Sequence, residues 1–147
     1  MKVLRFAVVC CLISTFFIFA PETKSVSPEI LKRCANPPVK EAYKNAKAVF
    51  AGKILSVAKD GDVKTFTFNV EKNWKGASSR QIKVSVRETM RYQAWFQVGK
   101  RYLVYARSDE NEEEKLWDGR CSRTKLLEDA SNDIKELGKA KKPVENN

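Results

Sequence analysis

The feature that most constrains the fold is a regular alternation of apolar and polar residues in the middle of the chain. Segments 63–71 and 81–87 show it most clearly, and the Asp60-Gly61 pair before the first of them is a strong hairpin signal. A period of two predicts β-strands that bury one face. The residues expected in the interior from these two strands are Phe66, Phe68, Val70, Ile82, Val84 and Val86.

Other segments complete a mainly β pattern. Strands are expected over 48–58, 101–107 and 116–117, and helical spacing predicts helices over 39–46 and 127–137. Segment 101–107 is apolar on both faces and is expected to be central, with Tyr102 and Val104 inside. Five short strands predict a five-stranded Greek-key barrel of the OB type, with a short N-terminal helix and a C-terminal α-helix. The alternative is a β-sandwich, which usually needs about seven strands.

The first 25 residues have the pattern of a secretory signal peptide. Lys2 and Arg5 precede an uncharged run over 6–20, which is shorter than the roughly 20 residues of a membrane span. Small residues at Thr23 and Ser25 favour cleavage after Ser25; a non-cleaved anchor is the alternative. The predicted organisation is signal peptide 1–25, extension 26–33, domain 34–138 and polar tail 139–147. We expect a secreted protein, or a periplasmic or cell-surface one in a bacterium, with no membrane contact after cleavage.

Composition restricts the chemistry. The 147 residues include no histidine, which excludes Ser-His-Asp triads, Cys-His dyads and histidine-ligated metals. No phosphate-binding or dinucleotide-binding glycine motif occurs, and the acidic run over 109–114 lacks the spacing of a calcium loop. We therefore expect a protein that is not an enzyme and has neither a cofactor nor an intrinsic metal.

Signal cleavage would leave two cysteines, Cys34 and Cys121. An even pair of cysteines in an exported protein predicts one disulfide bond. Two free thiols are the alternative.

Four motifs follow one another along the chain. They are Ala48-Val49-Phe50-Ala51-Gly52-Lys53-Ile54; Phe66-Thr67-Phe68-Asn69-Val70 with Trp74-Lys75-Gly76; Phe96 and Gly99 with Tyr102-Leu103-Val104-Tyr105-Ala106; and Cys121-Ser122-Arg123-Thr124 with Leu127, Ala130 and Leu137-Gly138. Their order and spacing resemble the netrin-like and tissue-inhibitor-of-metalloproteinases (TIMP) family over roughly 34–138. The resemblance implies an OB barrel in which Cys34 is tied to Cys121.

The TIMP resemblance also implies an activity. TIMPs chelate the catalytic zinc of a metalloproteinase with the amino group and carbonyl of an N-terminal cysteine, so the corresponding inhibitory edge would be Cys34, Ala35 and Asn36. The sequence departs from that pattern in two ways. Asn36 stands where the family has a second cysteine, and cleavage after Ser25 leaves eight residues before Cys34. A second cut after Lys32-Arg33 would expose Cys34.

The basic excess suggests a different kind of partner. The net charge is +10, and an exposed face of the barrel could hold a polyanion such as an anionic glycan, with Tyr92 and Trp95 available for stacking. Its candidate residues are Lys72, Lys75, Arg80, Lys83, Arg87 and Arg91. A solvated basic face is the alternative. Because export argues against nucleic acid, the expected partners are a metalloproteinase or another extracellular protein, or, on the alternative function, a glycan or cell-envelope polymer.

Overall fold

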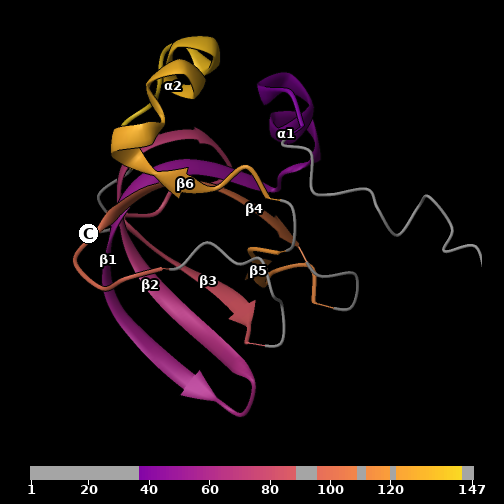
Figure 1. Cartoon of the computed structure of the whole chain (residues 1–147), viewed down its shortest axis with the longest axis vertical. Coiled ribbons are helices and arrows are strands. Elements are labelled where there is room, and N and C mark those ends of the chain that lie inside the picture. Colours follow the sequence, from indigo (N-terminus) through magenta and orange to yellow (C-terminus); the bar gives the residue numbers. More distant parts are fainter. Residues whose placement is uncertain (1–36, 89–95, 109–111, 120–121, 144–147) are drawn as a thin grey trace, which may run out of the picture. The chain divides into compact units, whose positions relative to one another are not determined.

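A long hairpin organises the molecule. The computed structural model describes residues 37–88, 96–108, 112–119 and 122–143, and Figure 1 shows their arrangement. Strands β1 (Ala48–Asp60) and β2 (Val63–Lys75) are joined by a two-residue turn at Gly61 and Asp62. The remaining elements are α1 (Val39–Asn45), β3 (Gln81–Arg87), β4 (Arg101–Ser108), β5 (Leu116–Trp117), β6 (Lys125–Leu126), the 3-10 turn η2 (Leu127–Asp129) and α2 (Ser131–Leu137).

Five of the strands form a closed ring of pairings. Strand β1 pairs with β2 on one side and with β4 on the other, and β3 and β5 complete the order β1-β2-β3-β5-β4. Every pairing is antiparallel except that between β3 and β5, which joins Val84 to Leu116 and Ser85 to Trp117. The fold is therefore mainly β, with one sheet and two α-helices among the described residues.

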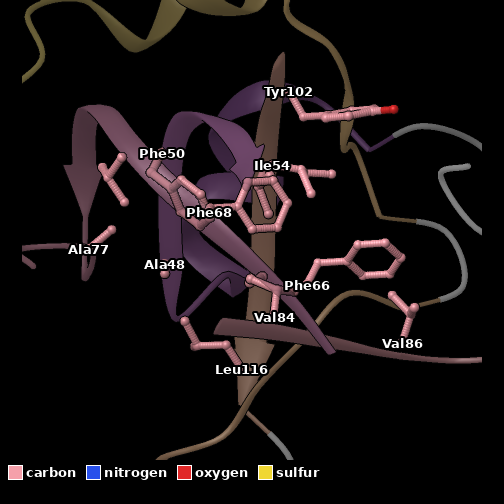
Figure 2. Close-up of a cluster of buried hydrophobic side chains, with 13 residues drawn as sticks. Ala48, Phe50, Ile54, Phe66, Phe68, Ala77, Val84, Val86, Tyr102 and Leu116 are labelled. Carbon is pink, nitrogen blue, oxygen red and sulfur yellow. The ribbon is translucent and has the colours of Figure 1, made fainter. Parts of the chain in front are cut away.

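The interior of the ring is aromatic and aliphatic, as the alternation predicts. Phe50 and Phe68 lie edge to face with ring centroids 5.3 Å apart, and Phe96 packs in the same way on Phe68 and Tyr102. Figure 2 shows Phe50, Phe68 and Tyr102 with other buried members of this cluster, which come from different strands. All eight residues expected in the interior belong to this cluster: Phe66, Phe68, Val70, Val84, Val86, Tyr102 and Val104 are buried, and Ile82 is partly buried against them.

The two helices lie together on one outer face of the sheet (Figure 1). Ala42 and Ala46, from α1 and its C-terminal end, and Ala130, which precedes α2, pack with Leu103 and Tyr105 of β4 in a second apolar cluster. This explains why β4 is apolar on both faces: one face lines the interior and the other receives the helices. Within the described residues, no helix has both the length and the apolar character needed to cross a membrane.

Two local predictions were wrong. The segment expected to form one helix over 127–137 instead contains η2, a break at Ala130 and then α2, and it is preceded by the short strand β6. Ser85 alternates with the interior residues Val84 and Val86, which predicts an exposed side chain, yet it is only 2% exposed. The cause is tertiary: β5 pairs alongside β3 at this position, and the backbone N–H of Asp118 donates to the Ser85 carbonyl at 2.9 Å.

Candidate functional site

A buried carboxylate organises the end of the chain. Asp133, in the first turn of α2, is 1% exposed. Arg123 donates two hydrogen bonds to this carboxylate, from Nε to Oδ2 at 2.5 Å and from Nη2 to Oδ1 at 3.0 Å. Lys125 Nζ donates to Oδ1 at 3.1 Å, and the Tyr105 hydroxyl donates to Oδ2 at 3.2 Å. Four donor atoms from three residues thus satisfy one carboxylate, which a buried charge requires.

These contacts set the ionisation of the cluster. Burial opposes the ionised form of Asp133, but the hydrogen bonds from Arg123 and Lys125 outweigh burial, so the pKa of Asp133 lies below its ordinary value. Burial and the adjacent carboxylate raise the pKa of Tyr105. Asp133 is therefore charged and Tyr105 protonated at neutral pH, which is the state that the hydrogen bonds need.

The same arginine also binds the backbone just before α1. Arg123 Nη1 donates to the Pro37 carbonyl at 2.7 Å, two residues before α1 begins. One guanidinium consequently connects three parts of the domain: the residues just before α1, the segment between β5 and β6, and helix α2. Arginine suits this role because its planar, always charged fork can serve a carboxylate and a carbonyl together.

A second buried carboxylate, Asp118, lies at the end of β5. It is 3% exposed, and Thr124 Oγ1 donates to its Oδ1 at 3.3 Å. The same Thr124 oxygen accepts the backbone N–H of Tyr105 at 3.0 Å. Burial raises the pKa of Asp118 to about 6, against the opposing effect of hydrogen bonds from Ser122, Thr124 and the Gly119 backbone. The Ser122-Arg123-Thr124 segment is thus held by two acids, because Asp118 binds Thr124 and Asp133 binds Arg123.

Trp74 joins the end of the hairpin to the end of the chain. Its Nε1 donates to the Gly138 carbonyl at 2.9 Å, immediately after α2, and its own carbonyl accepts the Tyr43 hydroxyl at 3.1 Å. Lys75 Nζ donates to the carbonyls of Tyr43 and Lys44 at the end of α1, at 2.9 and 3.1 Å. The Trp74-Lys75-Gly76 motif therefore has a structural role in docking both helices.

The predicted inhibitory edge, Cys34, Ala35 and Asn36, lies outside the described residues, and so does Cys121. The disulfide prediction stays untested for that reason. The residues nearest in sequence that the structure describes are Pro37 and Ser122, and the Arg123–Pro37 hydrogen bond joins the two segments.

The predicted basic residues do not all have side chains that are free of contacts within the domain. Lys75 is engaged at the end of α1, and Arg87 lies over the Trp117 ring at 5.1 Å. Lys72 is exposed on β2, whereas Lys83 is exposed on β3 beside the 112–115 segment. Arg80 is exposed and has a partner, and Arg91, Tyr92 and Trp95 lie outside the described residues.

Sequence reasoning did not single out Asp118 or Asp133 as buried groups. A signal existed for Asp133, because it lies on the same helical stripe as Ala130 and Leu137, and a charge on an apolar stripe needs a buried partner. Asp118 had no such signal, since it follows a strand of two residues. Across the described part of the chain, no group of three acidic or cysteine side chains could hold a metal ion.

The chain was compared with known protein families and with curated proteins. No family model matches it, and no match was found among the curated proteins.

Proposed function

We propose that this chain is an exported, non-enzymatic domain of the OB type, similar to TIMPs, that binds a protein partner through its N-terminal edge. The partner that the resemblance favours is a metalloproteinase. The closed ring of five strands with a helical cap supports the OB-type barrel, because a small Greek-key sheet of this type removes its exposed edges by closure.

The observation that carries the proposal is the hydrogen bond from Arg123 Nη1 to the Pro37 carbonyl, at 2.7 Å. Pro37 directly follows Asn36, the last residue of the proposed edge. Arg123 is itself fixed by the buried Asp133. An edge that must enter a protease cleft benefits from such an anchor, since a preordered segment loses less conformational entropy on binding.

The same contact supports the proposed disulfide bond. Cys34 is three residues before Pro37, and Cys121 is two residues before Arg123. Consecutive Cα atoms are about 3.8 Å apart, so short arms of chain lead from the hydrogen bond to both cysteines. A Cα separation of about 5.5–6 Å, which a disulfide needs, is within their reach.

The inhibitory chemistry requires a free amine at Cys34. An amine nitrogen has a lone pair that can bind zinc, whereas the nitrogen of a peptide bond has its lone pair delocalised. Residues 26–33 would convert this amine to an amide and would also have to pass the metal. Activity therefore depends on a second cleavage after Lys32-Arg33.

The test compares three forms of the protein against one matrix-type metalloproteinase: protein beginning at Val26, protein beginning at Cys34, and the latter with one alanine added before Cys34. We expect inhibition by the Cys34 form alone. The alanine form is the matched control, because it leaves the domain unchanged and converts the Cys34 amine to an amide, so that the free amine moves to the added residue. Potent inhibition by the Val26 form would refute the chelation argument, and failure of all three would refute the proposed partner.

Binding of a polyanion on the same fold is the second candidate. The structure favours it less, because Lys75 and Arg87 already have partners within the domain and three glutamates line the hollow beside Lys83. Strong retention on a sulfated polymer, lost at moderate salt, together with no inhibition by any of the three forms, would favour it instead.

A further inference from the structure

A hollow lies on the outer side of β2 and β3. It has a volume of about 1140 Å³, and its opposite wall is the segment from Glu112 to Leu116 that leads into β5. Strand β3 lies between β2 and β5 in the sheet (Figure 1), but β5 pairs with it only at Val84 and Ser85. Over Gln81–Lys83, the side of β3 that faces this wall has no partner strand among the described residues, and here the hollow opens.

The floor of the hollow includes several neutral hydrogen-bonding groups, beside the apolar Ile82 and Leu116. Thr65 and Ser85 lie opposite each other on β2 and β3, and their hydroxyl oxygens are 3.0 Å apart. Thr67 and Gln81 continue the same lining. A hydroxyl both donates and accepts, and a glutamine side chain has two donors and an acceptor. Such a floor matches a ligand that is itself rich in hydroxyl groups.

The charges around the hollow balance. Lys47, Lys83 and Lys115 line it together with three glutamates, Glu112–Glu114. Lys115 Nζ forms an ion pair with Glu112 Oε2 at 3.3 Å. Carboxylates accept hydrogen bonds from hydroxyl groups, and ammonium groups donate to hydroxyl oxygens, so this wall complements a polyol. A polyanion would be repelled by the glutamates and a polycation by the lysines.

We propose that this hollow, formed by Thr65, Thr67, Gln81 and Ser85 against Glu112–Lys115, binds an uncharged oligosaccharide. Its position agrees with the general behaviour of OB-type barrels, in which the second and third strands and the loop before the fifth strand bind oligonucleotides or oligosaccharides. The argument from position rests on the architecture proposed above. The balanced charge selects the saccharide, because an oligonucleotide needs a positively charged groove and stacking platforms.

The experiment uses the protein beginning at Val26 on an array of uncharged and sulfated oligosaccharides of matched length. Calorimetry then measures the dissociation constant of the best uncharged saccharide. We expect Thr67→Val, which keeps the shape of the side chain and removes its hydroxyl, to weaken binding by about three- to tenfold, the effect of one hydrogen bond. Thr67→Ser keeps the hydroxyl and should retain most of the affinity, and it reports on the site even where the valine variant folds poorly.

A second pair of variants tests the wall. Glu113→Gln should weaken binding of the uncharged saccharide, whereas Glu128→Gln, at an exposed glutamate outside this hollow, should leave it unchanged. Absence of any uncharged binder from the array would overturn the proposal. Binding of sulfated saccharides alone, weakened by Lys72→Gln and insensitive to Thr67→Val, would overturn it in favour of a basic surface. Inhibition of a metalloproteinase by the Cys34 form does not involve these residues, so either proposal can fail while the other stands.

Discussion

Replacement of Asp118 by asparagine tests the electrostatics of the segment that follows β5. Asp118 is almost fully buried at the end of β5, and burial raises its pKa from 3.8 to about 6. Asparagine has nearly the same shape and carries no charge at any pH. The substitution therefore removes the titration and keeps most of the packing.

The magnitude follows from the pKa shift. A shift of one unit corresponds to about 1.36 kcal/mol, so a rise from 3.8 to about 6 corresponds to about 3 kcal/mol. The folded-state pKa lies above the unfolded value, so the folded protein binds the proton more tightly. The stabilisation from Asp118 is fully present below about pH 3.8 and is lost as the pH rises through about 6.

The assay is chemical denaturation of the wild type and of Asp118→Asn at a series of pH values between about 3.5 and 7.5. The difference between the two proteins cancels the other titrating groups, including Glu88, whose pKa the hydrogen bonds from Lys59 and Lys64 lower to about 2. We expect the variant to gain about 3 kcal/mol relative to the wild type across this range. A difference that stays constant with pH would refute the reasoning.

Three further perturbations follow from the geometry, each measured as a change in the free energy of unfolding. Phe68→Ala, in the interior, should cost about 3–5 kcal/mol and Thr67→Ala far less; equal effects would mean that the strand register is wrong. Asp133→Ala leaves the partner cations unpaired and should cost about 3–5 kcal/mol, lowering the melting temperature at neutral pH. Gly76→Ala places a methyl group against backbone at φ +66 and should destabilise strongly, whereas Gly61→Ala, at φ +56 in open space, should cost about 1 kcal/mol; similar losses at both would contradict the crowding argument.

Most of the strands could be predicted because each has a local pattern of apolar and polar residues. The period of two over 63–71 and 81–87 identifies the buried face of β2 and β3 residue by residue, and the doubly apolar 101–107 segment identifies the central strand. Strand β6 could not be found, because its two residues, Lys125 and Leu126, have no period. Its pairing with β4 depends on contacts that no local pattern contains.

The buried polar network was harder to predict for the same reason. Ser85 is at a position that the alternation predicts to be exposed, but it pairs with Trp117 of β5 and contacts Thr65 of β2, and it is buried. Asp118 and Asp133 are fifteen residues apart in the chain and bind the neighbouring residues Thr124 and Arg123. Sequence spacing cannot show that two such acids converge on one segment, because their positions depend on the closure of the ring.

The network also relates the interior of the domain to its proposed edge. Asp133 fixes Arg123, and Arg123 fixes the Pro37 carbonyl, so the order of the N-terminal edge depends on a carboxylate in the last helix. Asp133 is held by four donors and is charged at neutral pH, whereas Asp118, which binds the neighbouring Thr124, has a pKa of about 6. Mild acid therefore neutralises Asp118, whereas Asp133 keeps its negative charge. Because Thr124 donates to Asp118 and accepts from the backbone of β4, protonation of Asp118 alters the hydrogen bonds next to the Arg123 anchor without breaking the anchor itself.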